Sequence, residues 1–167
     1  IQNAGDAEIT GIETDITWVP IDDLTINAAA TWLDTELTSA AIADTSAGTP
    51  LPTAPDLKLD FTARYEFTRG TWDAFLQGGA SYLGDRSIDI RATEAALIGT
   101  LPSYWTADLS TGIERNGLRL SLFIDNVFDE RGISGRYTEC AIQTCSGISY
   151  DVVTRPMTAG LRIGRRY

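Results

Sequence analysis

The sequence predicts an all-β protein, an antiparallel up-and-down transmembrane β-barrel of which this chain supplies about seven strands. Three features predict this fold. Apolar and polar residues alternate over long segments, and most of these segments exceed the roughly 5 to 6 residues that are usual for strands in soluble domains. Short and long connections between the segments also follow one another in strict alternation, as in bacterial outer-membrane barrels.

The clearest alternation lies in the segment LKLDFTARYEF, from Leu57 to Phe67. Its odd-numbered residues are apolar and its even-numbered residues are polar, so an extended chain presents one face of each kind. A soluble sheet would place the apolar face on a core, whereas a membrane barrel would place it on lipid. In a barrel the polar face must look inward, because one Arg or Lys near the midplane of the bilayer costs roughly 2 to 4 kcal/mol.

Six further segments repeat this pattern, and we expect each to form a strand. They are residues 7–19, 24–38, 72–83, 104–114, 118–125 and 154–167. No segment has a convincing helical pattern, so the prediction contains no helix.

The connections between these segments are of two kinds. Tight turns are expected around residues 20–23, 69–71 and 115–117, each with turn-forming residues. Long polar segments are expected at residues 39–55, 84–102 and 129–153. Outer-membrane barrels have short periplasmic turns and long external loops, while a Greek-key sandwich has no reason to keep this order.

Aromatic residues of the predicted apolar face fall at the two ends of the strands. The turn-side group is Trp18, Phe67, Trp72 and Tyr167, and the loop-side group is Trp32, Tyr82 and Trp105. Amphipathic rings gather at the two lipid–water interfaces, so these seven residues are predicted to form two aromatic bands.

Composition excludes several functions. The 167 residues carry a net charge of −10, which argues against nucleic acid as a partner. There is no histidine, no nucleophile elbow and no phosphate-binding loop, so we expect no enzyme, no catalytic residue and no cofactor. The acidic residues Asp125, Asp129 and Glu130 lack the spacing of a calcium loop, and no metal site is expected.

Cys140 and Cys145 are the two cysteines, in a polar segment with Gly and Ser. A disulfide that closes a small loop in an oxidising compartment is the preferred interpretation. Free thiols are the alternative, and zinc is a third, because two cysteines without histidine leave the metal short of ligands.

Several short motifs resemble one family when they are taken in order. They are Ala7 to Glu13 followed by Trp18, Pro20 and Leu24; Leu51-Pro52 with Pro55 and Tyr65; Asn126-Val127-Phe128-Asp129; and the terminal Tyr167 after Ala159, Leu161 and Ile163. This order resembles the late barrel strands of TonB-dependent outer-membrane receptors, although Arg165 departs from the final alternation.

The resemblance implies a barrel of roughly 22 strands that is filled by an N-terminal plug. Residues 1–167 would be its C-terminal segment, without the plug and about fifteen earlier strands. Strand counting agrees, since seven strands cannot close and would leave two unpaired edges in lipid.

The resemblance also implies a function and a location. The expected function is active uptake of a scarce nutrient, such as an iron–siderophore or another small ligand, across the outer membrane of a Gram-negative bacterium. The implied partners are outer-membrane lipid and lipopolysaccharide, the rest of the barrel and plug, the TonB complex through the absent N-terminal part, and the barrel assembly machinery, which would read Tyr167.

Candidate ligand-binding residues lie in the long loops. They are Arg86, Arg91, Arg131, Arg136 and Tyr137, of which the arginines could bind an anionic siderophore or a lipopolysaccharide phosphate. The alternative is that these arginines balance the nearby acids Asp85, Asp89, Glu130 and Glu139. Two other functions stay open: a small outer-membrane barrel or adhesin without TonB, and a secreted β-sandwich binding module.

Overall fold

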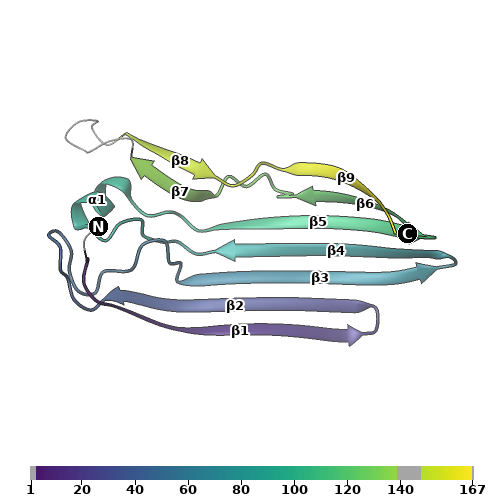
Figure 1. Ribbon diagram of the computed structural model, residues 1–167, viewed down its shortest axis with the longest axis horizontal. Coiled ribbons are helices and arrows are strands. Elements are labelled where there is room, and N and C mark those ends of the chain that lie inside the picture. Colours follow the sequence, from purple (N-terminus) through teal and green to yellow (C-terminus); the bar gives the residue numbers. More distant parts are fainter. Residues whose placement is uncertain (1–2, 139–147, 167) are drawn as a thin grey trace.

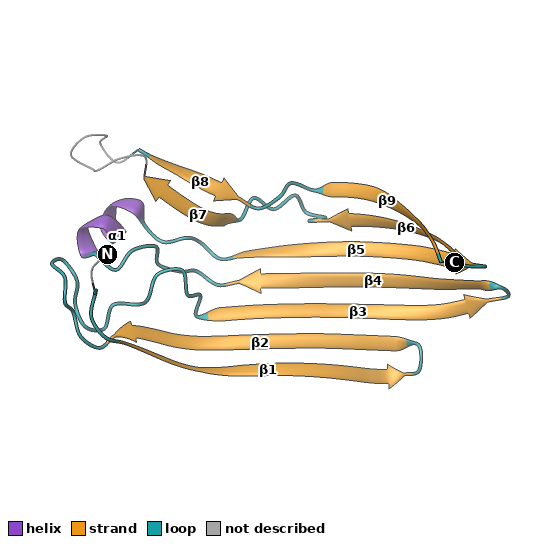
Figure 2. Ribbon diagram, viewed as in Figure 1, coloured by secondary structure: helices purple, strands orange, loops and turns teal. Residues whose placement is uncertain are grey.

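One antiparallel sheet organises the chain in the computed structural model, which describes residues 3–138 and 148–166 (Figures 1 and 2). The sheet has seven strands in the order β1-β2-β3-β4-β5-β6-β9. They are β1 (Ala7–Ile21), β2 (Leu24–Leu37), β3 (Leu57–Arg69), β4 (Trp72–Leu83), β5 (Tyr104–Arg115), β6 (Leu118–Asp125) and β9 (Thr158–Arg165). This order confirms the predicted up-and-down arrangement of antiparallel strands.

The predicted bounds of the first six strands agree with the structure within two residues. The seventh strand was predicted too long: it was expected from residue 154, but β9 begins only at Thr158. The preceding residues are bound to the loop instead: the Thr154 hydroxyl donates to the Glu130 carbonyl, and the Met157 amide donates to the Asp129 carboxylate. Pro156 between them has no N–H with which to join a ladder.

Three elements in the long connections were not predicted. They are α1 (Ala92–Ile98), β7 (Ile133–Thr138) and β8 (Ser149–Val153), and all lie at one end of the sheet (Figure 1). The expectation of no helix was therefore wrong. A helix of seven residues is too short to display a periodic pattern, although its Ala and Leu residues favour helix. Among the described residues, no helix has the length and apolar character needed to cross a membrane.

The strand register separates the residues into an apolar face and a polar face. On the apolar face, one row across β2 to β5 consists of Ala30, Leu59, Tyr82 and Trp105. On the polar face, the adjacent row consists of Ala29, Asp60, Ser81 and Thr106. Because neighbouring strands stay in this register, the alternation predicted for each strand extends over the whole sheet.

The apolar face has no protein cover among the described residues. Trp18 is 59% exposed and Leu122 is 56% exposed, whereas the buried hydrophobic residues are Leu37 and Leu101 near the loops. A large uncovered apolar surface requires lipid or another protein layer. A β-sandwich would pack a second sheet on this face, so the structure supports the predicted barrel rather than the β-sandwich alternative.

The two ends of the sheet differ as the sequence predicts. Tight turns connect β1 to β2, β3 to β4 and β5 to β6 at the turn end, and the long connections gather at the loop end (Figure 1). Asn116 and Gly117 form the β5–β6 turn with φ angles of 50° and 77°. Positive φ at both central residues is typical of a type I′ hairpin.

Candidate functional site

Polar side chains on the polar face form hydrogen-bonded pairs near the turn end. The Arg64 guanidinium contacts the Glu66 carboxylate at 2.8 Å and donates to the Gln77 side chain at 3.0 Å. Arg119 contacts Glu114 at 2.7 Å. The two ion pairs line a shallow concavity of about 340 Å³. The face is therefore a polar wall in which opposite charges alternate.

Asp60 and Glu66 do not form an acid pair on this wall. The Ser81 hydroxyl donates to Asp60 at 2.7 Å, and Lys58 lies 3.3 Å from the same carboxylate. Glu66 is paired with Arg64. Each carboxylate thus has its own partners, which fits a solvated barrel wall better than acid–base chemistry.

Two phenylalanine rings lie on the polar face, against its alternation. Phe75 packs over Gly112 of the next strand, and the Arg64 guanidinium lies 4.0 Å from its ring centroid. Phe123 packs over Gly160, with Arg162 4.2 Å from its centroid. Each ring thus covers a glycine backbone and supports a cation. The sequence analysis missed both rings, although an aromatic residue at a polar position of the alternation was a readable signal.

The predicted interface aromatics occupy the apolar face at two levels, except for Tyr167, which lies outside the described residues. On β4, Trp72 and Tyr82 are ten residues apart, about 33 Å along a strand. A tilt of about 40° reduces this to roughly 25 Å, the height of the apolar band of a membrane barrel. Tyr82 and Trp105 contact each other at the loop end, with ring centroids 4.7 Å apart.

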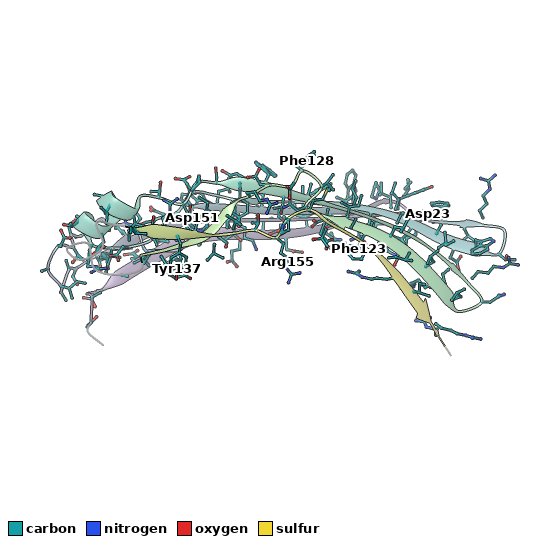
Figure 3. All side chains as sticks on the ribbon, turned by 90° about the horizontal axis from the view of Figure 1, so that it is seen from above. Asp23, Phe123, Phe128, Tyr137, Asp151 and Arg155 are labelled. Atoms are coloured by element: carbon teal, nitrogen blue, oxygen red, sulfur yellow. The ribbon has the colours of Figure 1, made fainter. Side chains whose placement is uncertain are left out.

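Phe128 is an aromatic residue near the loop-end level that the sequence analysis did not assign to a band. It is 77% exposed, and the amide of the preceding Val127 bonds to the Ala107 carbonyl of β5. With the sheet seen edge-on in Figure 3, Phe128 lies on the opposite side from Phe123 of the polar face. Phe128 therefore lies on the same side of the sheet as the residues of the predicted loop-side band.

The Asn126-to-Asp129 motif ties together the base of the longest connection. The buried Asn126 side chain donates to the carbonyls of Glu130 and Arg155, at 2.9 and 2.7 Å. The Glu130 amide donates back to the Asn126 side chain at 2.9 Å. Asn126 and Asp129 have φ angles of 53° and 51°, which Asn and Asp tolerate better than most residues. The motif is thus a structural clamp.

Arg86 lies inside the loop assembly. It is 6% exposed, and its guanidinium donates to the carbonyls of Ile133 and Ser134 at 2.9 and 3.2 Å. The Tyr104 ring lies 5.9 Å from the guanidinium carbon. Arg86 therefore connects the β4–β5 loop to β7, and in this arrangement its donors serve backbone carbonyls.

Arg136 and Tyr137 occupy opposite sides of the β7–β8 hairpin. Arg136 forms a bidentate pair with Asp151 of β8 and donates to the Ile98 carbonyl at the end of α1. The hydrogen bond from Arg136 lowers the pKa of Asp151 below its ordinary value. Tyr137 stacks on Tyr150 with ring centroids 5.6 Å apart, and both rings are more than half exposed.

Arg91 and Arg131 are exposed loop residues that pair with nearby acids. Arg91 contacts Asp89 at 2.6 Å and Glu94 at 3.6 Å, and its hydrogen bond lowers the pKa of Asp89. Arg131 contacts Asp129 at 3.1 Å. Hydrogen bonding from the Met157 amide, with Arg131, lowers the pKa of Asp129.

No described residues form a group of three or more potential metal ligands. The predicted disulfide between Cys140 and Cys145 lies outside the described residues. The structure brings Arg86, Arg136 and Tyr137 together around the β7–β8 hairpin, and Arg136 also connects α1 to this hairpin. By contrast, Arg91 and Arg131 each pair with an acid two residues away in the sequence.

A long-stranded, up-and-down sheet with an uncovered apolar face and a paired polar face defines the class as outer-membrane-type β-barrels. The chain belongs to the family described as TonB-dependent receptor-like β-barrels, whose model matches residues 1–127. Members of this family are outer-membrane transport receptors. No curated protein matches the sequence.

Solved structures of receptors have the same fold. The ferric yersiniabactin uptake receptor FyuA from Yersinia pestis matches with a TM-score of 0.81 and 17% identity, over 98% of this chain and 24% of that receptor. The siderophore receptor PiuA from Acinetobacter baumannii matches with a TM-score of 0.76 and 20% identity, over 96% of this chain and 22% of that receptor. The ferric-catecholate import receptor Fiu from E. coli K12 matches with a TM-score of 0.75 and 18% identity, over 96% of this chain and 21% of that receptor. The chain thus spans less than a quarter of the length of each.

Proposed function

We propose that this chain is part of a TonB-dependent outer-membrane receptor that actively imports a scarce small ligand, with ferric siderophores as the first class to test. The family match over residues 1–127 carries the proposal. The choice of ligand class is supported by the printed names of the similar structures, which are receptors for ferric yersiniabactin, siderophores and ferric catecholates.

The proposed position of residues 1–167 is the C-terminal part of the barrel wall. In the described sheet, β1 and β9 are edges with one neighbour each. Unpaired edges are not tolerated in lipid, so further strands of a roughly 22-stranded barrel would pair with them. The polar face would then contact the plug, and the apolar face would contact outer-membrane lipid and lipopolysaccharide.

Energy for uptake would come from the TonB complex through the N-terminal part of the receptor. The barrel assembly machinery would recognise the segment that contains Tyr167 and the alternating residues Ala159, Leu161 and Ile163 before it. The family match supports the first of these proposals, and the direction of β9, which runs toward the turn end, supports the second (Figure 1).

We assign ligand contact to the loop end, through Arg91, Arg131, Arg136 and Tyr137. The three arginines hold carboxylates already, so an anionic ligand would compete with Asp89, Asp129 or Asp151 for each guanidinium. The exposed Tyr137–Tyr150 stack offers an aromatic surface beside Arg136. Arg86 is assigned a supporting role, because its donors hold the hairpin.

The test is uptake of radioactive iron from a panel of ferric siderophores by cells that express the full receptor. Uptake of at least one complex is expected, and it should stop when TonB is disrupted. Replacing Arg136 and Tyr137 together by Gln and Ala should raise the apparent KM, whereas Arg69→Gln at the opposite end of the barrel should not. Surface binding without TonB-dependent accumulation would refute uptake and favour the adhesin alternative.

A further inference from the structure

The start of the short helix α1 is capped by a side chain from another connection. Arg91, which precedes the helix, makes no side-chain hydrogen bond to the first helical amides. Asp44 of the β2–β3 connection takes this role. Its carboxylate accepts a hydrogen bond from the Thr93 amide at 2.9 Å, and its carbonyl accepts one from the Ala92 amide at 2.8 Å. Asp44 therefore caps α1 across 49 residues of sequence.

The other end of α1 contacts Arg136 of the β7–β8 hairpin. The Arg136 guanidinium donates to the carbonyl of Ile98, the last residue of the helix, at 2.7 Å. The helix ends at Gly99, which has a φ of 74°, and a Cβ there would lie 3.7 Å from Nη1 of Arg136. An acid at the start of a helix and a base at its end both complement the helix dipole.

The stability of α1 depends on these contacts at its two ends. A helix of seven residues is too short to be stable by itself in water, and none of its residues is buried. The ion pair between Arg91 and Glu94 at its start is 3.6 Å long and partly exposed, so it adds little. Because the end contacts come from two other connections, α1 links the β2–β3 connection to the β7–β8 hairpin at the loop end (Figure 1).

The arginine that α1 holds belongs to the candidate ligand site. Arg136 pairs with Asp151 and precedes Tyr137, which stacks on Tyr150. Its Nη1 donates to the Ile98 carbonyl, whereas its Nε and Nη2 donate to the Asp151 carboxylate. The helix carbonyl and the carboxylate together fix the plane of the guanidinium. A displacement of the Ile98 carbonyl would therefore release one edge of that plane.

We propose that Asp44 is a positioning residue for Arg136, on which it acts through α1. With the cap in place, α1 holds the Ile98 carbonyl and orients the guanidinium toward an anionic ligand. Without the cap, α1 loosens and this orientation is lost. The role in ligand binding rests on the proposed function, whereas the coupling between Asp44 and the hairpin does not.

Hydrogen exchange of the full receptor without ligand tests the coupling. Asp44→Gly removes the carboxylate, keeps the carbonyl and suits the positive φ of 66° at this position. It should speed exchange in residues 92–98 by about 2- to 30-fold, the range expected for loss of a capping side chain. Exchange in residues 135–138 of the hairpin should rise by roughly twofold or more. Asp44→Asn keeps an acceptor oxygen and should restore both rates.

Thr53→Gly is the matched control. Thr53 lies in the same connection with a φ of 63°, and its side chain makes no hydrogen bond in the described part of the chain. Its backbone amide, which donates to the Ser87 carbonyl, is kept in the variant. Neither exchange rate should change.

The coupling should also be visible from the hairpin side. Arg136→Gln should speed exchange in residues 92–98, and its effect should be less than additive with that of Asp44→Gly, because both act through α1. Acceleration that stays within residues 92–98 in Asp44→Gly would overturn the proposal and leave Asp44 as a local cap. An equal acceleration in Thr53→Gly would overturn it as well.

Uptake separates positioning from a general loss of structure. For a ferric siderophore that the wild-type receptor imports, Asp44→Gly should raise the apparent KM and leave the maximal rate unchanged, and Asp44→Asn should restore the KM. A lower maximal rate with an unchanged KM would contradict the positioning role. If no siderophore is imported, the proposed function fails, while the exchange measurements still decide the coupling between Asp44 and Arg136.

Discussion

Adjacent alanines in β2 offer a direct test of the two faces. Ala28 lies on the apolar face, between Ile16 of β1 and Phe61 of β3. Ala29 lies on the polar face, between Asp15 and Asp60. The two residues have the same side chain in the same strand, so Ala28→Arg and Ala29→Arg differ only in the face that receives the charge.

The expected change in the free energy of unfolding depends on how deep each residue lies in the bilayer and on which side chains surround it. Ala28 is midway between Leu24 at the turn end of β2 and Trp32 of the loop-side aromatic band, so its replacement places a cation near the bilayer midplane. Arg on the lipid face at this depth costs roughly 2 to 4 kcal/mol. Ala29→Arg should cost less than about 1 kcal/mol or be stabilising, because two carboxylates face the new guanidinium across the strands.

The assay is urea unfolding of the full receptor in lipid vesicles. The folded fraction is measured on gels, in which folded and unfolded barrels migrate differently. Ala28→Arg should lower the unfolding midpoint clearly, and Ala29→Arg should leave it near the wild-type value. Equal destabilisation by both variants, or a larger loss for Ala29→Arg, would refute the assignment of the two faces.

Three other predictions concern the loop clamp, the hairpin and the covered glycines. Asn126→Ala should raise the rate of proteolysis in residues 129–157, since the lost hydrogen bonds are worth about 1 to 3 kcal/mol. The control is Asn116→Ala, which should not raise this rate. Asn116 also has a positive φ, but its side chain makes no hydrogen bond in the described structure. Arg136 lowers the pKa of Asp151 in the folded protein below its ordinary value of 3.8. The ion pair therefore contributes its full stabilisation at pH values above 3.8, and this contribution is lost as the pH falls through the lower pKa of the folded state. Hydrogen exchange in β7 and β8, corrected for its intrinsic pH dependence, should therefore be constant from about pH 7 to pH 5 and accelerate below 3.8; acceleration already near pH 6 would contradict this. Gly112→Val should cost about 1 to 3 kcal/mol, because a side chain there meets the Phe75 ring, the Leu120 carbonyl and the Ser121 side chain. Phe75→Ala should relieve the part of that cost that the ring causes in a double-mutant cycle, whereas simple additivity would contradict the stacked arrangement.

The strands of the sheet were predictable because each is long enough to show its alternation. In β3, six apolar residues alternate with charged and polar ones, and a shift of one residue would reverse both faces. The turns were equally readable, since Asn116-Gly117 is a strong local hairpin signal. Where local pattern and burial agree, the sequence is sufficient.

The loop end was less predictable because its structure depends on contacts between distant segments. Arg86 looks like an exposed loop cation in the sequence, yet carbonyls 47 and 48 residues away accept its hydrogen bonds. The partner of Arg136 was also missed, because Asp151 lies 15 residues away across the hairpin. For Arg91 the predicted balance by Asp89 is correct, since those two residues are neighbours in sequence.

The central claim is that one face of this sheet contacts lipid and the other faces an aqueous interior. The most direct measurement places a nitroxide spin label at each position of β3 in turn, from residue 57 to 69 of the full receptor in lipid bilayers. The account predicts that accessibility to oxygen and to a water-soluble nickel complex alternate in opposite phase, with oxygen highest at the odd-numbered positions 59, 61, 63 and 65. High accessibility to the nickel complex at those same positions would contradict the account.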